Sequence, residues 1–400
     1  MTGSKKANST HLLVIWQSLV VRTYRTPFDI LANEQNWHVG LCGPSAFREL
    51  GSQLRPWDQT SSANVATFPL PATVLHTQIM LLWGLGRILR TFFGAPAVRQ
   101  DSPEGRRIVL CVAEPYSVTA LWCYLQTRIF FGRHPFEFVT FGCQNIDKKF
   151  PWFLRRIETF VFTRSKKIWA VSAGQVSVLR SHGYRGPCLT IPLWYDGATF
   201  HPLDRTQADL ALNLQPLRPL RIGFAGSLLE EKGILDLTAA MRQSKWLQAT
   251  VALIVAGRGP LTELLTEQCS QANQSGGDWQ LLGPLPPEKM ASFYSAMDIL
   301  VVPSQTRAHW KEQFGRVAVE ALACGALVIA SDSGELPAVI RDTSRLFPEC
   351  NVAELSAMLE QTAKRLLPLS VTLRRASAQA GQWALTCSDR EVARAFAQQL

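Results

Sequence analysis

The amino-acid sequence predicts an α/β protein of two Rossmann-like domains facing a central cleft. A single hydrophobic core stops growing at roughly 250–300 residues, and this chain has 400. Short apolar segments alternate with amphipathic ones, which is typical of parallel strands covered by helices on both faces of a sheet. A polar stretch with prolines at 204–219 is expected to link the two domains.

The C-terminal domain is expected at 220–385, where the alternation is clearest. Helices are expected, for example, at Ile234–Trp246, Pro287–Ala296 and Val317–Ala323. The strands that they follow or precede are expected at Leu220–Ala225, Thr250–Ala256, Trp279–Leu282, Ile299–Pro303, Leu327–Ala330 and Arg345–Phe347. Because ligands bind at the carboxyl ends of parallel strands, functional residues should lie just after these segments.

The N-terminal domain, expected at 1–203, alternates less regularly. Its strands are expected at Leu12–Trp16, His38–Cys42, Ile108–Ala113, Phe136–Phe141, Lys167–Val171 and Leu189–Pro192. Residues 386–400 are expected to form a C-terminal helix, for which packing back onto the N-terminal domain is an open arrangement.

Composition favours a folded, cytoplasmic protein. Apolar residues make up 47% and charged residues 18%, which excludes wholesale disorder. The nine cysteines are scattered without a CxxC pair, which indicates a reducing compartment and neither a disulfide framework nor a zinc site. The apolar run Leu12–Trp16 is too short for a secretory signal. No run reaches the ~18 apolar residues of a spanning helix.

The net charge of +10 leaves three interpretations open: solubility, attraction to anionic substrates, and attraction to an anionic membrane. Nucleic acid is not expected as a partner, because the chain has no helix-turn-helix, zinc-finger or RNP-like pattern.

The strongest functional pattern is the segment KEQFGRVAVEALACG at 311–325. Its two glutamates, Glu312 and Glu320, stand eight residues apart around Phe314-Gly315. We expect Glu312 in a loop and a helix that starts near Gly315. The N–H groups from Phe314 to Arg316 would then point at a bound diphosphate. Glu320 would accept hydrogen bonds from vicinal hydroxyls such as those of a ribose, and Gly325 would close the helix.

This segment resembles the E-x7-E motif of retaining GT-B glycosyltransferases that use nucleotide sugars (glycosyltransferase group 1, family 4-like). The resemblance implies that Glu312 contacts the transferred sugar and that Glu320 binds the nucleotide ribose. The motif alone is unspecific, but the preceding strand, the Phe-Gly pair and the closing Ala-Cys-Gly sharpen the match. The alternative is a helix with one capping and one solvated glutamate.

A second pattern, Gly226-Ser227 followed by Lys232-Gly233, comes directly after the first strand of the C-terminal domain. A lysine beside a glycine-containing loop is a point charge for phosphate. The pattern resembles the family's phosphate loop, whose lysine stabilises the leaving diphosphate, which implies a catalytic role for Lys232. Ser227 departs from the family, which often has an arginine there. Either one positive phosphate ligand is missing here, or Arg258 or Arg316 supplies it.

Two weaker segments follow in family order. Val255–Gly259, which contains Arg258, resembles the segment after the next strand. The loop that resembles the family's base-contacting loop includes Gly283 and Leu285. Simple tight turns are the alternative for both.

The N-terminal domain should bind the acceptor, with a looser match. Glu114 follows one expected strand, and Gln144 and Asn145 follow another, where many family members have a histidine. Helix caps and turns are the alternative for these residues. The apolar stretch Trp83–Phe93 carries two arginines on an expected helix. It would either pack on the sheet, which we favour, or lie on a membrane surface.

The resemblance implies a retaining, metal-independent hexosyltransferase with no cofactor, the nucleotide-diphosphate sugar being its substrate. A glycan or lipid-linked acceptor in cell-surface polysaccharide synthesis, and peripheral contact with the inner face of a membrane, are expectations of the same kind. The alternatives are a nucleotide-sugar 2-epimerase on the same fold and a non-catalytic GT-B binding subunit.

Overall fold

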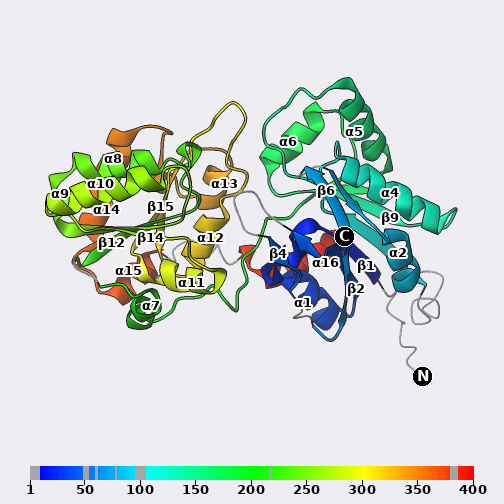
Figure 1. The fold of residues 1–400 in the computed structure, drawn as a ribbon, viewed down its shortest axis with the longest axis horizontal. Coiled ribbons are helices and arrows are strands. Elements are labelled where there is room, and N and C mark those ends of the chain that lie inside the picture. Colours follow the sequence, from blue (N-terminus) through cyan, green and yellow to red (C-terminus); the bar gives the residue numbers. More distant parts are fainter. Residues whose placement is uncertain are drawn as a thin grey trace. The chain divides into compact units, whose positions relative to one another are not determined.

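The computed structural model describes residues 10–47, 54–58, 62–76, 79–94, 105–215, 218–378 and 386–400. The chain divides into two compact units (Figure 1): Met1–Pro192 together with Asp389–Leu400, and Leu193–Ser388. Each unit is built on a parallel sheet with helices packed on it, which confirms the predicted α/β class with two Rossmann-like domains.

The first unit has a seven-stranded sheet in the order β11-β10-β9-β8-β1-β2-β5, in which every pairing is parallel. The strands are β1 (Thr10–Ile15), β2 (His38–Pro44), β5 (Val65–Leu70), β8 (Arg106–Cys111), β9 (Glu137–Gly142), β10 (Lys167–Ala170) and β11 (Cys188–Thr190). All six strands expected from the sequence are present. The edge strand β5 was not predicted; it contains Pro69, which an edge tolerates because one side needs no N–H donors.

The helices of the first unit are α1 (Thr26–Glu34), α2 (Leu85–Phe93), α4 (Val118–Phe131), α5 (Trp152–Arg164), α6 (Ala173–Ser181) and α16 (Asp389–Gln399). Two small antiparallel pairs accompany them: β3 (Ala46–Phe47) with β4 (Arg55–Pro56), and β6 (Ala72–His76) with β7 (Ile79–Leu82). Helix α2 buries Leu85, Leu89, Phe92 and Phe93 in the core. Its apolar face therefore packs within the unit, which was the favoured alternative.

The C-terminal helix α16 belongs to the first unit and packs on α1. The ring of Phe396 lies 5.6 Å from that of Phe28 and 5.1 Å from that of Trp169, measured between centroids. All three side chains are buried. This is the arrangement that was left open for residues 386–400.

The second unit has a six-stranded parallel sheet in the order β14-β13-β12-β15-β16-β17. The strands are β12 (Leu220–Ala225), β13 (Val251–Ala256), β14 (Trp279–Gly283), β15 (Ile299–Val302), β16 (Leu327–Ser331) and β17 (Leu346–Phe347). Each lies within two residues of its predicted bounds, because these short, almost wholly apolar runs are the centre of the unit's core.

The helices of the second unit are α7 (Arg205–Leu212), α8 (Ile234–Gln243), α9 (Lys245–Thr250), α10 (Thr262–Gln274), α11 (Pro287–Ala296), α12 (Arg316–Ala323), α13 (Leu336–Ile340), α14 (Val352–Leu366) and α15 (Val371–Ala378). The single helix expected at 234–246 is two helices, since the Ser244 hydroxyl accepts from the Leu247 amide and starts α9. None of the helices described here combines the length and the apolarity of a membrane crossing.

The stretch 204–219, expected as a linker, contains a folded helix instead. Helix α7 buries Ala208 and Leu212 and packs on α11. Arg205 at its start forms a bidentate ion pair with Asp298: Nη1 lies 2.8 Å from Oδ1, and Nη2 lies 3.0 Å from Oδ2. The stretch is therefore part of the second unit, because its apolar and charged residues have partners there.

Candidate functional site

The strand order of the second unit reverses between β12 and β15. From β12 the chain proceeds outward to β13 and β14, and then returns to place β15 on the other side of β12. Ligands of parallel sheets bind where the order reverses, just beyond the carboxyl ends of the two strands. The loops at this point are 226–233 after β12 and 303–315 after β15, which contain Lys232 and Glu312.

Lys232 and Glu312 form an ion pair across this point. The lysine Nζ donates to Glu312 Oε2 at 2.9 Å, and the hydroxyl of Ser304 donates to the same oxygen at 2.9 Å. The ammonium also lies 4.5 Å from the ring centroid of Trp310. The lysine side chain is 29% exposed and the glutamate 12%. The pair is thus partly shielded from water, while the ammonium stays accessible to an anion.

A close backbone approach holds the two loops together. Gly233 has a φ of +68°, and a Cβ built on it would lie 1.7 Å from the Pro303 carbonyl oxygen. Only glycine permits both the left-handed conformation and this contact. The amide of Gln305 donates to the Glu231 carbonyl at 2.8 Å. The positions of Lys232 and Glu312 therefore follow from main-chain contacts between their loops.

The turn after β16 contacts the main chain of Glu312. Gly334 has a φ of +57°, and a Cβ there would lie 2.1 Å from the Glu312 carbonyl oxygen. The amide of Glu335 donates to that same carbonyl at 3.1 Å. No function was expected for this turn from the sequence, yet it fixes the main chain of Glu312.

Helix α12 begins at Arg316, with Gly315 in the left-handed region at a φ of +82°, so Glu312 lies in the loop as expected. Phe314 is buried. Gly325 has a φ of +86° just after the helix and closes it, also as expected. The first amides of a helix have no acceptor within that helix, and its dipole is positive at this end. The start of α12 follows Glu312 closely in the chain. It therefore adds a second positive feature to the site, beside the ammonium of Lys232.

Glu320 is buried on α12 and is held from two sides. Tyr294 donates its hydroxyl to Glu320 Oε2 at 2.9 Å, and Arg316 Nε lies 3.3 Å from Oε1. Burial raises the pKa of the Glu320 carboxyl, and Arg316 and the Tyr294 hydroxyl partly offset that rise. The carboxylate is thus pre-oriented by groups that a hydroxylated ligand could replace or supplement.

The loops after β13 and β14 lie beside the Gly226 turn. Gly226 N donates to the Ala256 carbonyl at 3.0 Å, and Gly257 N donates to the Gly283 carbonyl at 2.8 Å. Leu228 N donates to the Arg258 carbonyl at 3.1 Å. Three predicted positions, Gly226, Arg258 and Gly283, are therefore brought together.

The side chains at these positions differ in exposure. Ser227 and Arg258 are exposed, and Leu285 is half-buried. Arg258 comes from the loop that contacts the residue directly after Ser227. Since Arg316 already pairs with Glu320, Arg258 is the better placed of the two arginines to supply the charge that Ser227 lacks.

The predicted acceptor residues lie together in the first unit. Glu114, after β8, is buried and accepts at 2.9 Å from both the amide and the thiol of Cys143. Burial raises the pKa of Glu114 to about 7, and the two donors only partly offset this. Gln144 donates to the Tyr116 hydroxyl at 3.2 Å, and Asn145 follows in the same loop. The Glu114–Cys143 contact thereby joins the loops after β8 and β9.

A histidine beside these residues was not predicted. His182 Nδ1 lies 2.7 Å from Glu158 Oε1, and its Nε2 lies 3.0 Å from Asp147 Oδ1. Both ring nitrogens therefore lie within hydrogen-bonding distance of a carboxylate oxygen. With Glu114 and Gln144, His182 and Glu158 line a small pocket.

Several residues of the second unit's site were also missed. Ser304 and Trp310 contact the ion pair, Tyr294 contacts Glu320, and Gly334 supports Glu312. Ser304 follows directly on a predicted strand and could have been found from that position. Trp310 stands two residues before Glu312 in the same loop and could also have been found from that position. Tyr294 and Gly334 come from separate segments, and nothing in the sequence joins them to the site.

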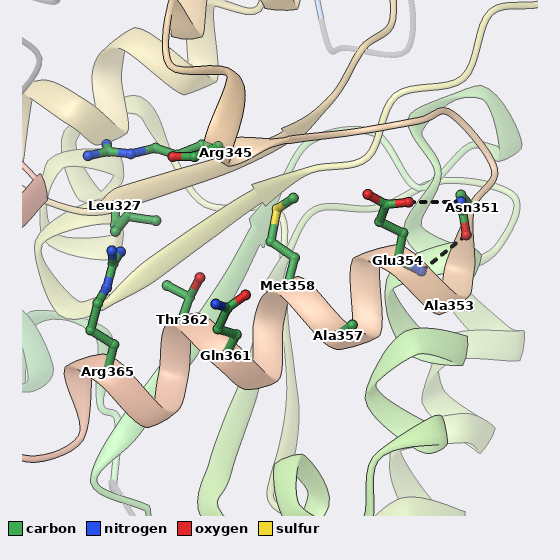
Figure 2. A pocket seen from close by; sticks show the side chains of 11 residues that line it. Leu327, Arg345, Asn351, Ala353, Glu354, Ala357, Met358, Gln361, Thr362 and Arg365 are labelled. Atoms are coloured by element: carbon green, nitrogen blue, oxygen red, sulfur yellow. Dashed lines mark hydrogen bonds between the residues drawn. The ribbon is translucent and has the colours of Figure 1, made fainter.

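A groove of about 570 Å³ lies elsewhere on the second unit, along α14. Figure 2 shows the helix as one wall, with Arg365 toward one end and Glu354 toward the other. Leu327, which starts β16, also lines it, so the groove lies at the amino end of that strand. It includes none of the predicted site residues. Within the described ranges, no three His, Cys, Asp or Glu side chains are grouped to hold a metal ion.

Residues 209–368 match the family model described as "Glycosyl transferases group 1". Lipopolysaccharide 1,2-N-acetylglucosaminetransferase of Salmonella typhimurium is 34% identical over 125 residues, which are 30% of this chain and 32% of that protein. D-inositol 3-phosphate glycosyltransferase of Segniliparus rotundus is 33% identical over 155 residues, 38% of this chain and 33% of that protein. The chain thus matches about a third of the length of these curated relatives.

Solved structures resemble this chain over almost its whole length, and two of them are described here. Sucrose-phosphate synthase from Thermosynechococcus elongatus has a TM-score of 0.64 at 19% identity, covering 97% of this chain and 98% of that one. HepE from Anabaena, solved in complex with UDP, has a TM-score of 0.67 at 15% identity, with the same coverage. At these identities the likeness establishes the fold, which is the predicted GT-B class.

Proposed function

We propose that the protein is a retaining glycosyltransferase. Its second unit carries a glycosyl transferases group 1 domain. The protein would move a sugar, a hexose by the family resemblance, from a nucleotide-diphosphate donor to a hydroxyl of a glycan or lipid-linked acceptor. By its name, the Salmonella typhimurium relative acts on lipopolysaccharide, which supports a role in cell-surface glycan synthesis.

The observation that carries the proposal is the Lys232–Glu312 pair at the reversal of strand order. A cation, a helix N-terminus and two carboxylates in this position have the charges that a diphosphate bonded to a sugar and a ribose requires. Lys232 and the first amides of α12 would hold the diphosphate, with Arg258 adding charge. Glu320 would accept from the ribose hydroxyls. Gly283 and Leu285 would lie against the base.

In the proposed reaction the bond between the anomeric carbon and the diphosphate oxygen breaks, and the electron pair stays on that oxygen. Lys232 and α12 stabilise the developing negative charge, which requires neither a metal nor a cofactor. Glu312 holds the sugar hydroxyls and balances positive charge on the ring. The acceptor oxygen forms its bond on the same face, and its proton passes to the leaving phosphate, so configuration is retained.

Glu114, Gln144 and Asn145 are proposed to contact the acceptor or the sugar. Their clustering at the ends of β8 and β9 supports this, because these strands too end at the ligand-binding edge of a parallel sheet. His182, which shares their pocket, is a further candidate.

The decisive experiment is thermal-shift screening of the full chain against UDP, GDP, ADP and their sugars, repeated with Lys232→Ala and Glu320→Ala. Stabilisation by one nucleotide that is lost in both variants supports the donor site and identifies the base. No stabilisation of the folded protein by any nucleotide rejects the transferase and favours a non-catalytic subunit.

Product analysis tests the remaining parts of the proposal. With the identified donor, NMR of the transferred sugar should show the donor's anomeric configuration, and activity should persist in EDTA. Epimerised sugar without an acceptor would assign a 2-epimerase instead.

A further inference from the structure

Exposed apolar side chains gather on one part of the first unit. Of the eleven large hydrophobic residues that are exposed in the described ranges, seven lie on the β6–β7 hairpin, the turn after it, α4 and the start of α5. Their exposed fractions reach 76% for Ile129 and 73% for Trp152. The seven are Val74, Leu75, Trp83, Leu125, Ile129, Trp152 and Phe153.

The elements that carry these residues pack against one another. Met80 N, in the hairpin, donates to the Thr119 hydroxyl at 2.8 Å, which fixes the hairpin to the start of α4. The ring of Trp83 lies 6.4 Å from that of Trp122 on α4. Helix α2 packs along α4, and α5 packs on α4 as well (Figure 1).

The exposed residues of α4 form a stripe. Trp122, Leu125 and Ile129 are spaced three and four residues apart, so they share one face of the helix. Tyr124, on another face, contacts Phe160 of α5 at 5.6 Å between ring centroids. Leu125 and Ile129 are exposed and Trp122 is half-buried, so this stripe is not covered by α5.

The charges on the same helices have one sign. Helices α2, α4 and α5, all fully described, carry six arginines and one acidic residue. That residue, Glu158, is buried against His182 and Arg155. None of the three helices therefore exposes a carboxylate. The arginines are Arg87, Arg90, Arg128, Arg155, Arg156 and Arg164, and all six are exposed.

We propose that this face, formed by the β6–β7 hairpin, α2, α4 and the start of α5, docks the protein on the surface of an anionic phospholipid bilayer. Tryptophan and phenylalanine side chains would enter the interface, and the arginines would meet the lipid phosphates. Charge complementarity selects this occupant. A purely apolar partner would not require six arginines, and a second copy of the same face would bring like charges together.

The proposal does not depend on the transferase reaction, since it needs no donor or acceptor. It differs from the membrane role considered for 83–93 alone, because the apolar residues of α2 are buried in the core. The exposed apolar residues come from the neighbouring elements, and α2 contributes the charges of Arg87 and Arg90.

The experiment is co-sedimentation of the full chain with vesicles of phosphatidylcholine alone and of phosphatidylcholine containing about 30% phosphatidylglycerol. Binding is expected only to the anionic vesicles. It should fall as salt is raised from about 0.1 to 0.5 M, because the Debye length shortens and the charges are screened. Each arginine near the surface contributes a factor of about five. Arg87→Glu with Arg128→Glu should therefore weaken binding at least 25-fold, and Ile129→Ser should weaken it several-fold.

Matched controls lie on the second unit. Arg365→Glu on α14 and Leu210→Ser on α7 change equally exposed side chains and should leave vesicle binding unchanged. Circular dichroism checks that every variant folds. Equal binding to neutral vesicles, no binding at all, or equal losses in the control variants would overturn the proposal. So would a dimer in size-exclusion chromatography that Ile129→Ser dissociates, since the face would then be an interface between copies.

Discussion

Replacing Lys232 by methionine should weaken binding of the donor nucleotide by about 10 to 150-fold. The substitution keeps the length and the apolar stem of the side chain and removes only the ammonium. A hydrogen bond to a charged group contributes about 1.5–3 kcal/mol, which corresponds to that range in Kd. The contact with the Trp310 ring is retained by the stem, so the fold should be preserved.

Because of the ion pair, Glu312→Gln should change nucleotide affinity in the opposite direction to Lys232→Met. At 2.9 Å the carboxylate attracts the ammonium by about 6 kcal/mol before desolvation is subtracted, at an effective dielectric constant of about 20. A diphosphate must compete with this carboxylate for Lys232. Glu312→Gln should therefore tighten binding of the nucleotide diphosphate several-fold, while slowing sugar transfer. In the Lys232→Met background the same change should have little effect on affinity.

Isothermal titration of the four proteins with the nucleotide found by thermal shift measures this cycle. Lys289→Met, on the exposed face of α11, is the matched control and should bind as the wild type does. A Kd for Lys232→Met within threefold of the wild-type value would refute the assignment of Lys232 to the diphosphate.

Three further predictions concern the support of the two sites. Gly334→Ala should lower the free energy of unfolding by about 2–4 kcal/mol and weaken donor binding, because its Cβ would lie 2.1 Å from the Glu312 carbonyl; urea denaturation measures this. Tyr294→Phe should cost about 1–3 kcal/mol in the same assay, since buried Glu320 loses its hydroxyl donor. Burial raises the pKa of Glu114 from 4.5 to about 7, so the stability it contributes is complete below about pH 4.5 and is lost as pH rises through 7. Glu114→Gln should remove that dependence, on the order of 3 kcal/mol between about pH 5 and pH 8.

The prediction for Gly334 has a control within the chain. Gly276 also has a positive φ, +84°, but no atom lies within 4 Å of a Cβ built there. Gly276→Ala should therefore cost only about 1 kcal/mol. Equal costs at the two glycines would reject the close approach at Gly334. For Glu114, a wild-type profile parallel to that of the glutamine variant would contradict the raised pKa.

The strands and the start of α12 could be predicted because their causes are local. Ile299–Val302 is a short apolar run, and Gly315 precedes an amphipathic stretch, so both are visible in a few consecutive residues. The placement of Glu312 in a loop followed directly from that helix start. The strand β5 was missed because its sequence contains Pro69, which a strand tolerates at the edge of a sheet but not at its centre.

The contacts that shape the site could not be predicted from one sequence. Gly334 approaches Glu312 from a different strand end, and Tyr294 reaches Glu320 from a different helix. Such pairs are fixed by tertiary packing, which local patterns do not encode. The prediction of a linker at 204–219 missed helix α7 for the same reason. Arg205 and Ala208 gain their partners only in the folded unit.

The position of α16 has a consequence for the order in which the protein is made. The first unit is completed by residues that follow the entire second unit in the chain. During synthesis the ribosome therefore releases residues 1–192 with Phe28 and Trp169 uncovered, and they remain so until Phe396 emerges. The second unit is continuous and can fold as soon as it has been translated. The nascent first half must stay unaggregated for the time that roughly two hundred further residues take, some 10–40 seconds at about 5–20 residues per second.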